Sequence, residues 1–292
     1  MANILVTGTS KGIGLVTALT LARAGHTVYA TMRNPAGAPE LAATAAAEKL
    51  PLDISAMDVD SDESVSAGVA EIARAAGQID VLVNNAGIER NGAIEEVSMA
   101  DMRAVMETNY FGAVRCAKAV IPAMRERRSG LIINVTSVAG RVCTSPLGPY
   151  AASKFALEAV SEAMAQELKA FNVRVAIVEP GIIDTPMTQG IDHPLQGSHY
   201  PQQARMAAYF AAALTTPRPP VLVAEKIQQI VESGTWQLRH PVGPGAVELI
   251  ESRKATSDED YVALQGGDDE TWYSFMEART GLALRAVKDG VA

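Results

Sequence analysis

The sequence predicts an α/β fold, with a doubly wound parallel sheet of about seven strands and helices on both faces. Short apolar runs alternate with longer segments of helical periodicity along most of the 292 residues, which is typical of a parallel sheet. The first apolar run, residues 3–7, leads directly into a glycine-rich turn and a helix. Several candidate site residues follow predicted strands, at the edge where such folds bind ligands.

The composition is that of an ordinary soluble globular protein, with 48% hydrophobic and 20% charged residues. A net charge of −8 argues against a nucleic-acid surface. No apolar run approaches the roughly 20 residues that a membrane span needs, and no signal peptide is visible. The two cysteines, Cys116 and Cys143, lack metal-ligand spacing and fit a reducing compartment. We therefore expect a cytoplasmic protein with a single domain over residues 1–292 and no metal site.

The glycine-rich turn has the sequence Gly8-Thr9-Ser10-Lys11-Gly12-Ile13-Gly14. Three glycines let the backbone approach a pyrophosphate, and the following helix, which we expect to end near Gly25, supplies N–H donors and a favourable dipole. The spacing is G-x-x-x-G-x-G, not the commoner G-x-G-x-x-G. Such a turn can also be purely structural, but its position directly after the first strand favours a dinucleotide.

The second predicted strand, residues 27–31, bears on the choice of cofactor. In NAD-binding folds an acidic residue near the end of this strand binds the adenosine ribose. Met32 occupies that position here, Arg33 follows it, and Lys11 lies in the glycine turn. Two cations and no carboxylate suit a 2′-phosphate, which favours NADP(H) over NAD(H). The alternative is that both cations are merely exposed basic residues.

The chain up to residue 84 continues the alternation. An alanine-rich helix is predicted over residues 36–47, followed by a third strand within residues 50–59. Its end carries Asp58 and Val59, where a carboxylate would meet the adenine. Ser61 then caps a helix that reaches about residue 76.

A fourth strand over residues 79–84 runs into Asn84-Asn85-Ala86-Gly87, whose small residues let the chain pass close to a cofactor. A long helix follows over residues 99–126. Asn109 lies inside it, where asparagine is mildly unfavourable, so its amide either has a function or is simply exposed or bonded in the core. This helix and the one over residues 150–171 are apolar on more than one side, which predicts a homodimer or homotetramer.

The predicted chemistry centres on Tyr150 and Lys154, which lie four residues apart and share one helix face. A lysine ammonium beside a tyrosine favours the phenolate, so it should lower the tyrosine pKa from about 10 towards the working range. Ser137 follows the fifth strand, residues 130–135, and its hydroxyl would hold a substrate oxygen next to the tyrosine. By itself, the Tyr–Lys pair is weak evidence, because this spacing more often marks an exposed amphipathic pair.

A sixth strand over residues 173–178 precedes a proline-rich stretch, residues 184–220, which is predicted to form a flap over the site. The flap contains a short apolar helix over residues 203–214. Four of its side chains either line an apolar pocket or pack the flap down: Tyr200, Met206, Tyr209 and Phe210. Its histidines, His193 and His199, have no matching ligand cluster. A helix over residues 221–232, a seventh strand over 238–242 and a helical C-terminal extension over 245–292 complete the chain.

In order and spacing, these motifs resemble those of the classical short-chain dehydrogenases/reductases, over about residues 2–242. The matching motifs are Thr7-Gly8-x-x-x-Gly12-x-Gly14, Asp58, Asn84-Asn85-Ala86-Gly87, Asn109, Ser137, Tyr150-x-x-x-Lys154 and Pro180-Gly181-x-x-x-Thr185. Three further segments resemble the branch that includes the 17β-hydroxysteroid and retinol dehydrogenases: Thr31-Met32-Arg33, Gly148-Pro149-Tyr150 and the run from Arg239 to Pro244. The resemblance implies a Rossmann-type fold.

The resemblance also implies a role for each catalytic position. Tyr150 would protonate the carbonyl oxygen in reduction and act as the base in the reverse direction. Lys154 would bind the nicotinamide ribose and lower the Tyr150 pKa, while Ser137 would orient the substrate oxygen. Asn109 would hold a helix kink and a water that links Lys154 to solvent. The residues expected to bind the cofactor are Gly8, Ser10, Lys11, Gly12, Ile13, Gly14, Arg33, Asp58, Val59, Asn85, Ala86, Gly87, Tyr150, Lys154, Pro180, Gly181, Ile183 and Thr185.

We therefore expect an NADP(H)-dependent oxidoreductase that transfers a hydride between the nicotinamide and a small-molecule ketone or secondary alcohol of apolar character. A non-catalytic NADP(H)-binding sensor on the same fold is the alternative, and it is disfavoured because all four catalytic residues are present. The glycine spacing and short chain disfavour an epimerase or dehydratase. Two departures from the family leave the substrate open. Asp184 introduces a charge near the nicotinamide end, and the extension after about Gly245 exceeds the family core.

Overall fold

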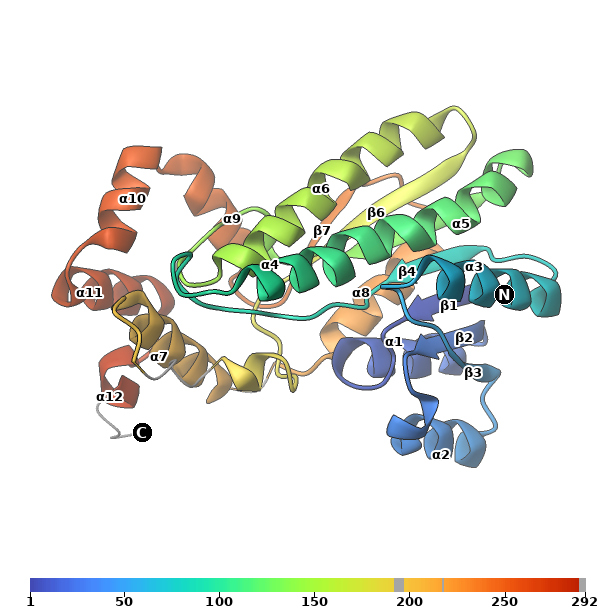
Figure 1. Cartoon of the computed structure of the whole chain (residues 1–292), viewed down its shortest axis with the longest axis horizontal. Helices are drawn as coiled ribbons and strands as arrows, with labels where there is room; N and C mark the ends of the chain where they lie inside the picture. The colour runs from blue at the N-terminus through green and yellow to red at the C-terminus, as the bar shows by residue number, and fades with distance from the viewer. Residues whose placement is uncertain (192–196, 217, 289–292) are drawn as a thin grey trace.

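The computed structural model describes residues 1–191, 197–216 and 218–288, and these residues contain one parallel sheet of seven strands (Figure 1). The strand order is β3-β2-β1-β4-β5-β6-β7. The strands are β1 (Asn3–Thr7), β2 (Thr27–Met32), β3 (Leu52–Ala56), β4 (Val81–Asn84), β5 (Gly130–Val135), β6 (Val173–Pro180) and β7 (Arg239–Val242). Every neighbouring pair is parallel. The predicted fold class is therefore confirmed.

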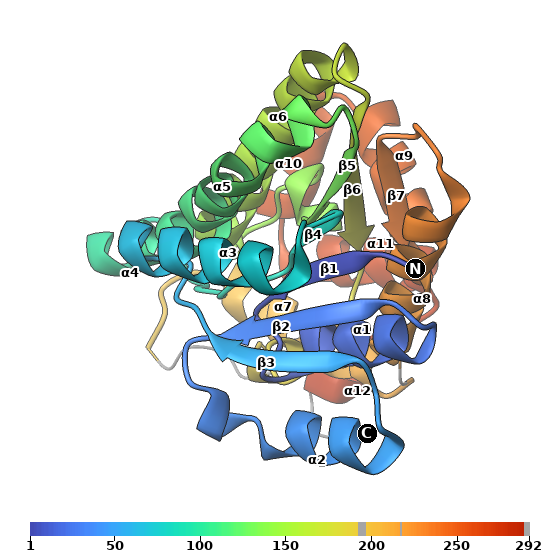
Figure 2. The same ribbon diagram turned by 90° about the vertical axis from the view of Figure 1, so that its right-hand side faces the viewer.

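Helices cover both faces of this sheet (Figure 2). One face packs against α1 (Gly12–Arg23), α2 (Pro39–Glu48) and α8 (Val221–Ser233). The other face packs against α3 (Asp62–Ala76), α5 (Ala113–Glu126) and α6 (Gly148–Lys169). Because successive strand side chains point to opposite faces, Ile4 and Val6 of β1 enter the first cluster and Leu5 enters the second.

The sheet has its topological switch point between β1 and β4. From β1 the chain proceeds through β2 and β3 to one edge, whereas β4 lies on the other side of β1 and starts the run to β7. In open parallel sheets, ligands bind in the crevice outside the carboxyl ends of the strands at such a point. The glycine turn after β1 and the Asn85-Ala86-Gly87 segment after β4 therefore meet there.

Two predicted helices are divided in the structure. The 99–126 helix consists of α4 (Met99–Met106), a π-helical turn η2 (Glu107–Gly112) and α5, with Asn109 inside the π-helical turn. The alanine-rich segment divides into a 3₁₀ turn η1 (Pro35–Gly37) and α2, because a proline at each start lacks the N–H that would continue a preceding helix. The predicted Ser61 cap is confirmed, since its side chain accepts a hydrogen bond from Ser64 N, and the Ser98 side chain caps α4 in the same way by accepting from Asp101 N.

The C-terminal extension packs against the helical part of the predicted flap. It comprises α9 (Ala246–Ala255), α10 (Asp258–Gly266), α11 (Asp269–Thr280) and α12 (Leu284–Lys288). Figure 1 shows α7 (Gln202–Leu214) beside α11 and α12, at the end of the molecule away from β3. Ala208 and Ala212 of α7 form an apolar cluster with Trp272, Tyr273 and Leu284. The extension therefore anchors α7.

The four flap side chains were predicted either to line an apolar pocket or to pack the flap down, and the structure supports packing. Met206 and Phe210 are buried, Tyr209 packs against the α7–α11–α12 cluster, and the Tyr200 hydroxyl bonds to Glu95. None of the four lines the cavity described below. The short 3₁₀ turn η4 (Thr188–Gly190) contributes to the cavity lining instead, and a second one, η3 (Val138–Gly140), directly follows the lining residue Ser137.

Metal and membrane features can be assessed only within the described part of the chain. There, no group of three or more His, Cys, Asp or Glu side chains has an arrangement that could hold a metal ion. His193, one of the two flap histidines, lies outside the described residues, whereas the backbone N–H of His199 donates to Glu96. None of the described helices combines the length and the apolar character that crossing a membrane requires.

Candidate active site

A cavity of about 450 Å³ lies at the carboxyl edge of the sheet, and it is lined by every residue that the sequence predicts to bind a dinucleotide. These residues are Gly8, Ser10, Lys11, Gly12, Ile13, Gly14, Arg33, Asp58, Val59, Asn85, Ala86, Gly87, Tyr150, Lys154, Pro180, Gly181, Ile183 and Thr185. Ser137 also lines the cavity, whereas Asn109 lies behind its wall. Residues from the ends of six strands and from α6 therefore converge on one site.

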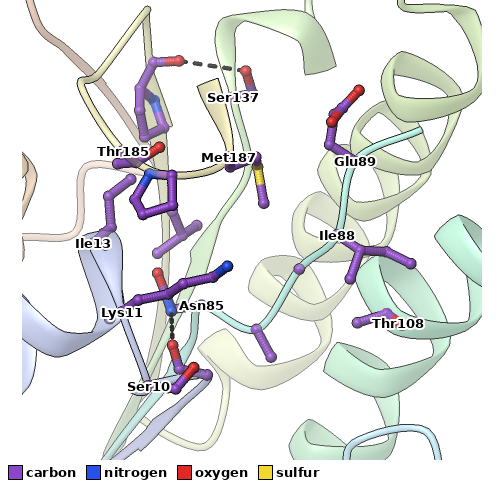
Figure 3. A pocket seen from close by; sticks show the side chains of 18 of the residues that line it. Ser10, Lys11, Ile13, Asn85, Ile88, Glu89, Thr108, Ser137, Thr185 and Met187 are labelled. Atoms are coloured by element: carbon purple, nitrogen blue, oxygen red, sulfur yellow. Dashed lines mark hydrogen bonds between the residues drawn. The ribbon is translucent and has the colours of Figure 1, made fainter. Parts of the chain in front are cut away.

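The glycine turn is held close to the end of β4. A Cβ added at Gly8 would lie 2.6 Å from Ala86 Cα, and one added at Gly14 would lie 2.3 Å from the Gly8 carbonyl oxygen. The side chain of Asn85 donates to the carbonyls of Thr7 and Gly8, at 2.9 and 3.0 Å (Figure 3). The amide of Asn85 therefore orders the turn, and glycine is required wherever the two segments touch.

The amino end of α1 is suited to an anion. Lys11 is its N-cap but makes no capping hydrogen bond, and the first turn contains no acidic residue. The first N–H groups of the helix are therefore free of side-chain caps and carry the positive end of the dipole. Together with the close-packed glycines, this cradle fits the pyrophosphate of a dinucleotide.

Two exposed cations, Lys11 and Arg33, line the cavity at the ends of β1 and β2. Met32 beside them is buried. Asp58 also lines this part of the cavity, but one of its carboxylate oxygens accepts the Asp60 N–H at 3.1 Å. Burial raises the pKa of Asp60, although Arg33 opposes the shift. This end of the cavity therefore combines the two cations with the carboxyl groups of Asp58 and Asp60.

At the opposite end, Ser137, Tyr150 and Lys154 come together from β5 and α6. The Ser137 hydroxyl donates to the Pro180 carbonyl at 3.4 Å (Figure 3). The Lys154 ammonium donates to the Val135 carbonyl at 3.0 Å and lies 5.6 Å from the centre of the Tyr150 ring. A phenol, a second hydroxyl and a buried ammonium are therefore available to one substrate oxygen.

The sequence predicts a lowered Tyr150 pKa. This prediction is wrong, because the net shift of the Tyr150 pKa in this structure is upward. Burial raises the pKa of Tyr150 to about 12, the Ser137 hydroxyl opposes that shift, and the charge of Glu89 adds to it. Burial also lowers the pKa of Lys154 to about 8, against the influence of Glu158. The reason is that both groups lie in a poorly solvated site, where desolvation of the charged form outweighs their pairing.

Asn109 connects two segments that flank the cavity. Its carboxamide accepts the Ile88 N–H at 2.8 Å and donates to the Ile88 carbonyl and the Ser153 hydroxyl, both at 2.9 Å. The Ser153 hydroxyl in turn donates to the Tyr150 carbonyl at 2.7 Å. The π-helical turn thus aims Asn109 at both the loop after β4 and the first turn of α6, so this residue positions the site. Its proposed role towards a water stays a prediction.

The sequence analysis missed Glu158, which is buried one turn beyond Lys154 on α6. Its carboxylate accepts the Thr136 hydroxyl at 2.7 Å and pairs with Arg239 of β7 at 2.9 Å. A detectable signal was the repeated four-residue spacing of Tyr150, Lys154 and Glu158, which places an acidic residue on the same helix face. The charge of Glu158 raises the pKa of Lys154 and so opposes the lowering that burial causes.

The sequence analysis also missed Glu89, which lines the cavity two residues after the Asn84–Gly87 segment. The only signal for it was its closeness to that motif. Asp184, the charge expected near the nicotinamide end, lies between the lining residues Ile183 and Thr185. It is absent from the described cavity lining, and its carboxylate accepts a hydrogen bond from Gln189 at 2.8 Å.

Comparisons with known proteins give consistent matches. A family model described as short chain dehydrogenase matches residues 2–196. The 3-ketodihydrosphingosine reductase of Bacteroides thetaiotaomicron is 40% identical over 186 residues, 63% of this chain and 65% of the relative. Retinol dehydrogenase 8 of Homo sapiens is 44% identical over 187 residues, 62% of this chain and 59% of the relative. The chain therefore matches less than two thirds of the length of either relative.

One solved structure is also similar over most of the chain. It is a variant of actinorhodin polyketide ketoreductase with NADPH, at a TM-score of 0.75 and 29% identity. The match covers 84% of this chain and 97% of the ketoreductase.

Proposed function

The chain belongs to the short-chain dehydrogenase family, and from this premise we propose that it is an NADP(H)-dependent carbonyl reductase. It would transfer a hydride between the nicotinamide and a ketone or secondary alcohol of apolar character. The observation that carries the proposal is the convergence of Ser137, Tyr150 and Lys154 at one end of a cavity whose other end is the glycine turn. Further support comes from the relatives, whose names describe ketone reduction or alcohol dehydrogenation.

The mechanism assigns distinct tasks to the side chains. NADPH, when bound, supplies the hydride. Ser137 and Tyr150 hold the carbonyl oxygen, and the Tyr150 hydroxyl gives it a proton as charge develops there. Lys154 binds the nicotinamide ribose through its ammonium. Because the pKa of Tyr150 is raised to about 12, the phenol remains protonated at neutral pH, which is the form that donates a proton in reduction.

The proposal is tested with a panel of aromatic and alicyclic ketones, each offered with NADPH and with NADH. We expect ketone-dependent loss of NADPH absorbance with at least one ketone. Tight NADPH binding without turnover of any carbonyl would favour a sensor and contradict the proposal.

Cofactor preference is tested at Arg33, which lines the cavity and is exposed beside the buried Met32. Replacing Arg33 with Ala should raise the Kd for NADPH by roughly 10–50-fold, because a charge-assisted contact with the 2′-phosphate is lost. The Kd for NADH should change less than about twofold, because NADH lacks that phosphate. Fluorescence titration measures both values. Arg74→Ala, at an exposed site on α3, is the matched control, and equal losses for the two cofactors would refute the assignment.

Glu158 should set the alkaline limit of activity through Lys154. Glu158 raises the pKa of Lys154, which burial lowers to about 8. In Glu158→Gln the ammonium is therefore lost at lower pH, so the alkaline limb of kcat/KM moves down in pH. We expect roughly fivefold lower kcat/KM than wild type at alkaline pH and near-equal values in mild acid. Glu162→Gln, one turn further and more exposed, is the control, and overlapping pH profiles would contradict this role.

We also propose a homodimer or homotetramer. Phe111 of η2 and Phe155 of α6 are large apolar side chains with 47% and 42% of their surface exposed. Such residues are commonly covered by another subunit. Light scattering at micromolar concentration should give at least twice the mass of one chain, and Phe155→Glu should shift the distribution towards monomer. A wild-type monomer under these conditions would count against the proposal.

A further inference from the structure

Glu89 lies at the same end of the cavity as the proposed proton donor. Figure 3 shows it at the end that holds Ser137, whereas Ser10 and Lys11 lie at the other end. The preceding residue, Ile88, is fixed by two hydrogen bonds to Asn109, at 2.8 and 2.9 Å. The backbone that carries Glu89 is therefore anchored next to the reacting groups.

The carboxylate of Glu89 makes no hydrogen bond or ion pair with any side chain that the structure describes. Arg90, the adjacent cation, is committed elsewhere. Its Nε donates to Asp101 at 2.9 Å and its Nη1 donates to the Glu89 backbone carbonyl at 2.8 Å. Burial raises the pKa of Glu89 to about 7 and the charge of Arg90 opposes that shift, so the site holds a half-buried carboxyl group whose oxygens bond no described side chain. Such a group is costly unless a partner compensates it.

The surroundings of Glu89 restrict what that partner can be. Glu89 lines the end of the cavity that holds Ser137, so a ligand group that neutralises Glu89 lies near the carbonyl oxygen that Ser137 and Tyr150 hold. The same end of the cavity is lined by the apolar side chains of Ile88 and Met187 (Figure 3). The complementary ligand therefore combines a cation close to a carbonyl with an apolar group.

We propose that Glu89 selects amino ketones, whose ammonium group it binds while Ser137 and Tyr150 hold the neighbouring carbonyl oxygen. This inference rests on the proposed carbonyl reductase function and names its substrate class. In the reaction the hydride of NADPH forms the new C–H bond at the carbonyl carbon. Tyr150 gives its proton to the oxygen and is reprotonated from solvent. The ammonium is unchanged, so the products are an amino alcohol and NADP⁺.

The experiment compares two ketones of nearly equal shape, aminomethyl phenyl ketone and ethyl phenyl ketone, with NADPH at neutral pH. We expect Glu89→Gln to lower kcat/KM for the aminomethyl ketone roughly 10–100-fold, because the charged contact is lost. The value for the ethyl ketone should change less than about threefold, because that ketone makes no such contact. The decisive quantity is the ratio of the kcat/KM values for the two ketones in Glu89→Gln, divided by the same ratio in wild type. The intrinsic reactivities of the two ketones cancel in this quotient. Glu71→Gln, an exposed carboxylate on α3, should leave both values at those of wild type.

Failure of this inference can be distinguished from failure of the proposed function. If wild type reduces the ethyl ketone but Glu89→Gln leaves the preference unchanged, the Glu89 assignment is wrong and the reductase function stands. If neither ketone is consumed, calorimetry with the two corresponding alcohols and NADP⁺ decides. Weaker binding of the amino alcohol alone to Glu89→Gln would support ammonium recognition, and equal binding to both proteins would overturn it.

Discussion

Replacing Tyr150 with Phe should lower kcat/KM for ketone reduction by roughly a thousandfold, within the range that a general acid contributes. Phe keeps the ring in place on α6 and removes only the hydroxyl that donates the proton. The contact between the ring and the Lys154 ammonium, 5.6 Å from its centre, can persist. NADPH affinity should therefore stay within about threefold of wild type, because the lost hydroxyl acts on the substrate oxygen.

Steady-state kinetics and fluorescence titration of NADPH measure the two effects separately. Tyr209→Phe, in the α7–α11–α12 cluster, removes a hydroxyl outside the cavity and should leave activity unchanged. If Tyr150→Phe kept a tenth or more of wild-type activity, the assignment of Tyr150 as the proton donor would be contradicted. Because the pKa of Tyr150 is raised to about 12, its own titration should not limit reduction between mild acid and mild alkali.

Replacing Lys154 with Met should have the second largest effect, because it removes a group with two tasks. We expect kcat/KM to fall roughly 100–1000-fold and the Kd for NADPH to rise about tenfold. The loss of cofactor affinity separates this variant from Tyr150→Phe. Methionine fills a similar volume without a charge, so the buried position keeps its packing.

Lys169→Met, at the last turn of the same helix, is the matched control, because Lys169 lies over the ring of Trp236 and outside the cavity. Its activity and NADPH affinity should equal those of wild type. Wild-type NADPH affinity in Lys154→Met would contradict the assignment of the ammonium to the cofactor. Thermal unfolding of both variants shows whether a loss reflects damage to the fold.

The strands and the glycine cradle could be predicted from sequence because their signals are local. Apolar runs mark the strands, and the 8–14 turn is defined by its own glycines and the helix that follows. The sequence places Asn85 and Ala86 near the cofactor because they directly follow β4. Their contacts with Thr7 and Gly8 across the switch point depend on the assembled sheet.

Other features depend on contacts between distant segments and could not be read from local patterns. The π-helical turn accompanies bonds that join Asn109 to Ile88 and Ser153, residues far from it in the chain. Glu158 acquires its role through Thr136, which follows β5, and through Arg239 of β7. The packing of α7 likewise depends on the extension, whose sequence indicated only exposed acidic helices.

The Tyr150 pKa shows that a correctly predicted pair of residues can still lead to the wrong direction for a pKa shift. The spacing of Tyr150 and Lys154 predicted their closeness, and an isolated pair of that kind would lower the tyrosine pKa. In the folded chain, burial dominates instead and outweighs the opposing hydrogen bond with Ser137, while the charge of Glu89 adds to the rise. The local motif therefore identified the two residues, but burial in the folded chain reversed the expected shift of the Tyr150 pKa.

The central claim is that this cavity passes a hydride to a carbonyl carbon while Tyr150 protonates the oxygen. Its most direct test is a single turnover with NADPH that carries deuterium on the transferred position, followed by mass spectrometry of the alcohol. The account predicts that wild type delivers deuterium to the carbinol carbon and that Tyr150→Phe delivers almost none in the same time. Bound NADPH with no deuterium in any product, or equal transfer by both proteins, would contradict it.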